Sequence, residues 1–587
     1  MTIMKVYIAI FGFYIAPLFL SAEGLREGRH GADGHIVQNT LSQVDTAHLR
    51  MLYLNGLKQR AEGRTEEAQQ TFRHIVREQP GHYQAQYELA RVSLELQDYR
   101  TAEEAAQAAA AGQPDKKAHW ELLLEVYRQT GNLADMPSVF QALARIEPDN
   151  PAHYHSEAYV YFLNKDYERS LERYAQARAR VGDTEDGIIG ESEVYVAMEK
   201  PDAAIDRLTA FVKKKPKTVR PHMLLAELYT LTQQPRRALK TLDQAAERFP
   251  DEGIVLLGRA DAYLAMGRER QALENLKVAF EGQQLDIDAK ASVLYTTLGN
   301  NARPLSDEAV GELADILVSQ YPQNPQAHAV RGDVYAQLGD ATRAREGYLN
   351  ALDINMYLEP VWQQLLQAEL QLGLNDEVVK HGEEAATLFP NNAIIAFFTG
   401  HGLMANKDLT GARAQFEHAL NTAHAASPVQ LSQLYSSLGD VYNALEMYPE
   451  SDVAYEEAIV ADTANAYALN NYAYYLALRK EKLEQAASMA ERAVSLQPGV
   501  EHYEDTYAWV LFQQGKYDEA LVWIQRAMDS ADQPSEVLYE HYGDILAMSG
   551  EIDNAVTQWK RALDVATSVG KDIDRLSKKI NERKYIE

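Results

Sequence analysis

The stretch that decides the fold is PQAHAVRGDVYAQLGDATRAREGYLNALDINM, residues 325–356. Counted from its first residue, it has small side chains at positions 8 and 20 (Gly332 and Ala344) and tyrosines at positions 11 and 24 (Tyr335 and Tyr348). Small residues allow two antiparallel helices to approach closely where they cross, and the tyrosines lie on the faces that such a pair would bury. The pattern predicts two packed helices.

A turn is expected at Gly339, since glycine commonly follows the last residue of a helix, and a second helix should begin near Ala341. One helix pair cannot bury its apolar faces alone, so similar units must precede and follow it. The spacing resembles the tetratricopeptide repeat, a helix–turn–helix unit of 34 residues. The resemblance implies an all-α solenoid, a right-handed superhelix of about 15 repeats with a concave groove.

Prolines and tyrosines extend this register along the chain. Pro80, Pro114 and Pro148 lie 34 residues apart, as do Pro216 and Pro250. The expected organisation is repeats 1–7 over residues 49–286, a degenerate eighth repeat or bend over 287–324, repeats 9–15 over 325–569, and a capping helix over 570–587.

The capping helix is expected to bury one face on the last repeat and leave the other in solvent. Its apolar side carries Ile573, Leu576 and Ile580. Its basic residues are expected elsewhere on the helix: Lys578, Lys579, Arg583 and Lys584.

The amino terminus has the features of a secretory signal peptide over residues 1–22. Lys5 precedes an apolar run from Val6 to Leu20, and Ser21 and Ala22 supply a cleavage site before Glu23. An uncleaved anchor and a buried helix are the alternatives, but the run is shorter than the roughly 20 residues that span a membrane. The mature chain would begin near Glu23 with a flexible leader over 23–48, and the protein would be periplasmic, outer-membrane-associated or secreted.

Composition excludes several classes of function. Lys plus Arg total 57 and Asp plus Glu total 85, which gives a net charge of −28. Such a chain repels phosphate backbones, so nucleic acid is not an expected partner. The absence of cysteine excludes disulfides, thiolate metal sites and a lipidated amino-terminal cysteine. No phosphate-binding loop, metalloprotease motif or serine-nucleophile motif is present, so neither an enzyme nor a bound cofactor or metal is expected.

In the resembled family, positions 2, 5, 9 and 12 of each first helix line the groove. Carried onto repeats 13–15, this gives aromatic side chains beside acids and amides, a combination that suits peptide binding. For each aromatic, simple packing between repeats is the alternative. The candidate partner-binding residues are Tyr467, Asn470, Tyr474, His502, Asp505, Trp509, Phe512, Glu540 and Asp544.

Repeats 1–4 provide a second, more basic candidate groove. It consists of Tyr53, Arg60, Tyr87, Arg91, Arg128, His155, Tyr159 and Phe162. No repeat combines Lys at position 5 with Asn at position 9, the pair that clamps a carboxyl terminus in some members of the family.

Repeats 13–15 also resemble the carboxyl-terminal repeats of bacterial cell-envelope proteins that act as scaffolds. The resemblance implies a non-enzymatic adaptor that binds other proteins, in association with envelope complexes. Two alternatives stay open: an accessory factor for outer-membrane assembly, secretion or polysaccharide export, and a receptor for peptides or glycans.

Overall fold

The computed structural model describes residues 43–587 except 215, 251, 300–304, 569, 570 and 572. The signal peptide and most of the leader therefore lie outside the described residues. Every regular element in the described part is a helix, as an all-α repeat array requires, so the predicted fold class is confirmed. None of these helices is long and apolar enough to cross a membrane.

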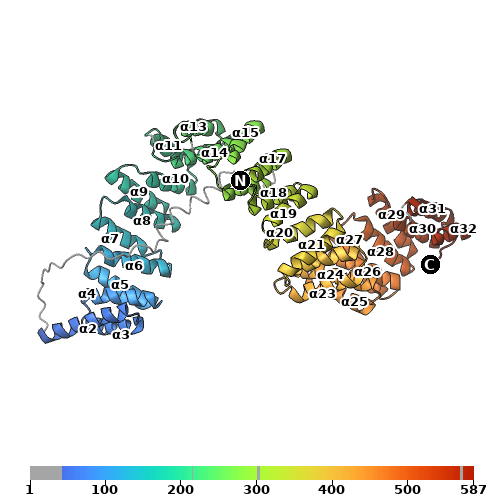
Figure 1. Ribbon diagram of the computed structural model, residues 1–587, viewed down its shortest axis with the longest axis horizontal. Helices are drawn as coiled ribbons and strands as arrows, with labels where there is room; N and C mark the ends of the chain where they lie inside the picture. Colours follow the sequence, from blue (N-terminus) through green and yellow to red (C-terminus); the bar gives the residue numbers. More distant parts are fainter. Residues whose placement is uncertain (1–42, 215, 251, 300–304, 569–570, 572) are drawn as a thin grey trace. The chain divides into compact units, whose positions relative to one another are not determined.

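The chain divides into two compact units, one through Gln320 and one from Tyr321. Within each, nearly all consecutive helices pack against one another in chain order (Figure 1). The first unit contains α2 (Gln43–Ala61), α3 (Thr65–Glu78), α4 (Tyr83–Glu95), α5 (Tyr99–Gly112), α6 (Lys117–Thr130), α7 (Met136–Ile146), α8 (Pro151–Leu163), α9 (Tyr167–Val181), α10 (Glu185–Ala197), α11 (Pro201–Val212), α12 (Arg220–Leu231), α13 (Pro235–Arg248), α14 (Gly253–Ala265), α15 (Glu269–Glu281), α16 (Ile287–Leu298) and α17 (Asp307–Gln320).

The second unit begins with the repeat that opened the sequence analysis. It contains α18 (Pro325–Gln337), α19 (Ala341–Ile354), α20 (Glu359–Gln371), α21 (Asn375–Leu388), α22 (Ala393–Ala405), α23 (Leu409–Thr422), α24 (Pro428–Ala444), α25 (Tyr448–Ala461), α26 (Ala466–Arg479), α27 (Leu483–Leu496), α28 (Glu501–Gln513), α29 (Tyr517–Ser530), α30 (Glu536–Met548), α31 (Ile552–Ser568) and α32 (Asp574–Glu582).

The small residue at position 8 is required because an aromatic ring from position 24 lies against it. A Cβ added to Gly332 would come within 2.5 Å of the Tyr348 ring, and one added to Gly543 within 2.5 Å of Trp559. The same pairing, 16 residues apart, joins Gly56 to Phe72, Gly400 to Phe416 and Gly439 to Tyr455. This contact is the physical basis of the repeat register.

The turn inside each regular repeat has a left-handed backbone at position 15. Glycine occupies it where sequence analysis expected a turn, as at Gly339 with φ of 80°. Other repeats place a residue with a side chain in the same conformation, and the position recurs at Gly63, Gln97, Gly131, Lys165, Glu199, Gln233, Gly267, Gly339, Gly373, Lys407, Glu446, Lys480, Gly515 and Gly550. The geometry is therefore set by the packing of the helix pair and does not depend on glycine, which only lowers its cost.

Two expectations about the ends need correction. Helix α2 already begins at Gln43, inside the predicted leader of residues 23–48. At the other end, Lys579 was expected in solvent but is 1% exposed. Its ammonium group is buried against two carboxylates of α30, so α32 does not have a simple apolar and a simple charged side.

Candidate functional site

A groove runs along α20, α22 and α24 of the second unit. Two adjoining hollows of about 560 and 600 Å³ lie there, and they share Gln367, Phe397, Phe398 and Gln433. We call this surface, together with the start of α26, the open groove. It is formed by the first helices of repeats 10–13, the helices that line the concave side in the resembled family.

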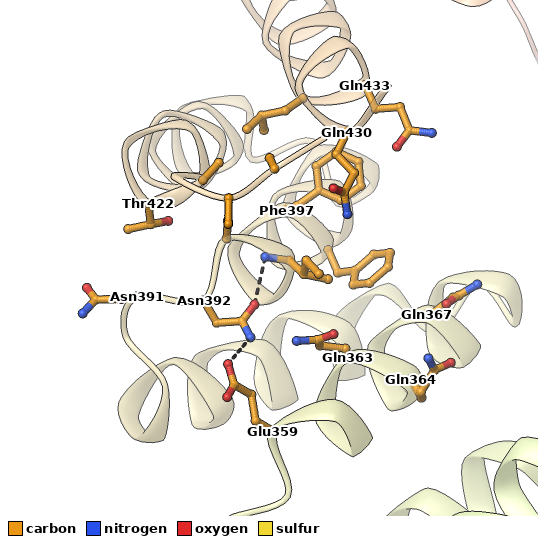
Figure 2. A pocket seen from close by; sticks show the side chains of 17 residues that line it. Glu359, Gln363, Gln364, Gln367, Asn391, Asn392, Phe397, Thr422, Gln430 and Gln433 are labelled. Carbon is orange, nitrogen blue, oxygen red and sulfur yellow. Dashed lines mark hydrogen bonds between the residues drawn. The ribbon is translucent and has the colours of Figure 1, made fainter. Parts of the chain in front are cut away.

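The lining of the open groove is rich in amides and nearly uncharged. Figure 2 shows Gln363, Gln364 and Gln367 along α20 on one side and Gln430 and Gln433 of α24 on the other, with Phe397 between them. Local capping positions one edge: the Asn392 side chain accepts hydrogen bonds from the backbone amides at the start of α22 and donates one of 2.5 Å to Glu359.

His401 lines the same hollow as the two phenylalanines. Its ring lies 4.6 Å from that of Phe397, and its Nε2 is 3.2 Å from the hydroxyl oxygen of Ser437 on α24. Burial lowers the pKa of His401, and the distant Asp440 opposes this only in part. The imidazole is therefore neutral at pH 7, which leaves the middle of the open groove without a formal charge.

Tyr467 is the one primary candidate that lies in the open groove. Its side chain is 47% exposed and lines the larger hollow. Its hydroxyl donates to Asp440 at 2.5 Å, and Asp440 also accepts from Tyr475 at 3.0 Å and from Tyr455. Burial, with the Asp440 charge, raises the pKa of Tyr467 and keeps its hydroxyl protonated as a donor. The carboxylate thus holds Tyr467 at the rim.

Most of the other primary candidates are buried. Trp509 and Phe512 are 7% and 5% exposed and stack on one another with ring centroids 4.8 Å apart. Trp509 also stacks on His541 at 4.0 Å, and the His541 ring bonds Asp505 at 2.8 Å. Asn470 is buried and Tyr474 half-buried, while His502 is exposed. Trp509 and Phe512 are thus packed between repeats, which is the alternative interpretation of these aromatics.

The two remaining acids are covered by the end of the chain itself. Lys579 of α32 lies 2.7 Å from Glu540 and 2.7 Å from Asp544, and Arg575 lies 2.9 Å from Glu540. Burial raises the pKa of Asp544 to about 6 although Lys579 opposes it. Burial also opposes ionisation of Glu540, but Lys579 and Arg575 outweigh it and lower the pKa of that carboxyl. We call the α28 and α30 surface around Asp505, Glu540 and Asp544 the closed face.

The last residues continue along the same row of first helices. The Tyr585 ring meets Phe512 of α28 edge-on at 5.3 Å, and the terminal Glu587 pairs with Lys480 after α26 at 2.5 Å. The chain end therefore covers three of the positions that were predicted to hold a partner, Phe512, Glu540 and Asp544.

The second candidate groove, in the first unit, is half-buried and internally paired. Arg60 and Arg91 both pair with Glu88, at 3.1 and 3.5 Å, so the expected positive surface is largely neutralised. Arg128 lies near Glu125 at 3.6 Å. The aromatic members contact other rings: Tyr53 contacts His82, Tyr87 contacts His119 and His155 contacts Tyr174 on following repeat elements, while Tyr159 stacks on Phe162 of the same helix, α8.

One group of possible metal ligands occurs among the described residues. His48 of α2 and His74 and Glu78 of α3 bring three ligand atoms within 4.8 Å of one another, and all three residues are exposed. His74 and Glu78 already bond each other at 3.1 Å as an ordinary pair one helical turn apart.

The sequence composition favoured the last repeats over the open groove, because aromatic residues stand beside acids there. The same positional rule finds the open groove: Gln363 and Gln367 are positions 5 and 9 of repeat 10, and Phe397 and His401 are positions 5 and 9 of repeat 11. Sequence gave no signal that the equivalent positions of repeats 14 and 15 would be covered.

The family models agree with the repeat register. Two family models, each described as tetratricopeptide repeat, match residues 59–126 and 195–254 and residues 232–279 and 306–357. A TPR repeat-containing protein of Pseudomonas aeruginosa is 26% identical over 220 residues, which are 37% of this chain and 36% of that protein. The match thus spans about a third of the relative's length.

Solved structures give weak overall matches. The Cut9–Hcn1 complex of the APC/C has a chain that is 14% identical and aligns over 86% of this chain and 97% of its own, with a TM-score of 0.37. A tetratricopeptide repeat protein from Parabacteroides merdae is 16% identical over 44% of this chain and 99% of its own, with a TM-score of 0.36. The repeat register and the family models together show that this chain contains tetratricopeptide repeats, a repeat type that implies a protein–protein interaction scaffold.

Proposed function

We propose that the protein is a non-enzymatic scaffold of the bacterial cell envelope that binds an extended segment of a partner protein in the open groove. The observation that carries the proposal is the row of uncharged amide side chains facing half-exposed Phe397 and Phe398 across adjoining hollows. Glutamine side chains can donate to and accept from the backbone of an extended peptide, and aromatic rings provide the anchors that usually dominate such binding.

The charge of the open groove limits the kinds of segment that it can bind. Glu359 stands at one edge and is bonded to Asn392, Asp462 stands at the other end, and His401 is neutral. A segment with an apolar or aromatic residue flanked by uncharged polar residues fits this surface better than a highly charged one.

A peptide selection tests this function. Peptides selected on the purified chain from a displayed random library should bind the native chain, and Phe398→Ala should weaken that binding more than tenfold, or about 1.4 kcal/mol. Val460→Ala is the matched control, because Val460 lies 75% exposed on the second helix α25, outside the groove. Equal binding by native and Phe398→Ala chains, both folded by circular dichroism, would place the binding surface elsewhere.

A glycan is the second ligand class that the lining supports, since amides beside aromatic rings also suit sugar hydroxyls and ring faces. A glycan array with the same two variants separates the classes. Glycan binding that depends on Phe398, without any selected peptide, would replace the scaffold by a receptor.

The envelope location rests on the first 22 residues alone. Amino-terminal sequencing of the native protein should begin near Glu23. A start at Met1 in a cytosolic fraction would remove the envelope from the proposal and leave the groove unaffected. The roles in outer-membrane assembly, secretion or polysaccharide export are narrower forms of the same scaffold.

A further inference from the structure

Helix α32 lies on the closed face in the way that a ligand lies in a binding site. Arg575 and Lys579 are four residues apart on α32, so they lie on one face of that helix, and both reach Glu540. Lys579 also makes two bonds, of 2.7 and 2.8 Å, to the Asp544 carboxylate. Two acidic side chains four residues apart on α30, Glu540 and Asp544, are thus arranged to recognise spaced cations on a helix.

The acids themselves are held in place by the repeats. Asp544 accepts a hydrogen bond of 2.9 Å from the buried Trp559 indole, and Asp505 is held by His541 at 2.8 Å. Because these partners lie on α30 and α31, the closed face keeps its shape independently of α32.

By contrast, α32 is anchored shallowly. Of its nine residues only Leu576 and Lys579 are buried. Leu576 inserts into the apolar cluster around Trp559, while Arg575, Lys578 and Glu582 are exposed. A short helix with so few buried groups opens more easily than the long helix pairs beneath it.

We propose that the closed face is a second docking site, for a basic helical segment of a partner protein, and that the chain's own α32 occupies it until such a segment displaces it. The partner segment would carry Lys or Arg at two positions one helical turn apart, an apolar residue between them, and an aromatic residue beyond to meet Phe512. This site is separate from the open groove and does not depend on its function.

A fluorescent peptide with the sequence of residues 571–587 serves as the probe, and anisotropy reports its binding to the full chain. Leu576→Asp in the chain places a charge in the apolar contact and should release its own helix. We expect this variant to bind the probe at least tenfold more tightly than the native chain does. A probe carrying Lys579→Glu should bind at least tenfold more weakly. Equal affinity for both chains, or indifference to the reversed charge, would overturn the proposal.

Two further measurements guard against misfolding and separate the two sites. The chain has no cysteine, so Lys480→Cys with Glu587→Cys can be joined by a bismaleimide linker, which should abolish the probe binding that each single-cysteine chain retains. Probe binding that survives the linkage would contradict displacement. Phe398→Ala in the open groove should leave probe binding unchanged.

The source of the bound helix is tested by size-exclusion chromatography. A native chain that is monomeric, and stays monomeric with Leu576→Asp, supports occupancy by its own helix. A dimer that Leu576→Asp dissociates would mean that a second copy supplies α32, and would overturn occupancy within one chain.

Discussion

The open groove and the closed face are built from equivalent positions of neighbouring repeats, yet they differ in every property that matters for binding. Positions 5 and 9 are Gln363 and Gln367 in repeat 10, uncharged and lining a hollow, but Glu540 and Asp544 in repeat 15, buried under α32. The helix scaffold is the same in both. The comparison teaches that the groove positions of a repeat array have no fixed exposure. Their exposure depends on whether another part of the chain covers them.

The largest expected difference between the two surfaces is the effect of a substitution at Trp509 on the free energy of unfolding. Because Trp509 is packed between Phe512 and His541, Trp509→Ala should lower the free energy of unfolding by about 3–5 kcal/mol. Phe398→Ala, at a half-exposed site, should cost clearly less while reducing ligand binding. Urea unfolding followed by circular dichroism measures both. A Trp509→Ala chain as stable as the native one would show that Trp509 is not part of the core.

Removal of the buried Lys579 cation is expected to have the next largest effect. Lys579→Met leaves Glu540 and Asp544 without their shared partner, and we expect a loss of about 1.5–3 kcal/mol in the stability of α30 and α32. Hydrogen exchange of those helices at pH 7 measures it. Adding Asp544→Asn should recover part of the lost stability, since Asn can still accept a hydrogen bond from Trp559. A double variant less stable than Lys579→Met alone would argue that the ion pair is not the cause of the loss.

A smaller effect comes from His541, which faces Asp505, Asp544 and Glu540. Burial lowers its pKa but those acids outweigh burial, so the folded pKa lies above the ordinary 6.5. Its stabilising contribution is therefore fully present below pH 6.5 and is lost as pH rises through the folded pKa. The raised pKa of Asp544, about 6, acts in a lower window.

The expected observation is a melting temperature that falls between pH 6.5 and pH 9 in the native chain and falls less in His541→Gln. Measuring above pH 7 keeps the carboxyl titrations out of the window. Parallel pH profiles for the two chains would exclude a charged His541–Asp505 pair.

The smallest expected effect is one of salt. Binding of a selected peptide to the open groove should change little between about 0.05 and 0.5 M salt, because the lining is nearly uncharged, whereas probe binding to the closed face should weaken several-fold as its charges are screened. Titrations at the two salt concentrations measure the change in affinity at each site. A steep salt dependence at the open groove would remove the contrast between the sites.

Local sequence carries a great deal of this fold. Gly332 and Tyr348, sixteen residues apart, are enough to predict a crossing of two helices, because the ring fills the space that a side chain on the glycine would need. The turn at position 15 is harder to predict from sequence. Gln97 and Lys165 adopt the left-handed conformation as well as Gly339 does, and no rule based on glycine alone would find them.

The candidate site was less predictable. Tyr467 lies at the open groove, because its position in the repeat determines which way it points. Trp509 and Phe512 follow the same rule and are nevertheless buried, since neighbouring repeats and the chain end close over them. The positional rule gives direction but not exposure.

By itself, the sequence determined the helix pairs, their register and the all-α array, because each of these depends on residues within about 34 positions of one another. Tertiary structure alone decided which groove is open. Lys579 meets Glu540 and Asp544 across 39 and 35 residues, and a lysine in a short amphipathic helix looks the same in sequence whether it faces water or carboxylates. Only packing brings these opposite charges together out of water, because nothing in the local sequence specifies which surface the nine-residue helix will contact.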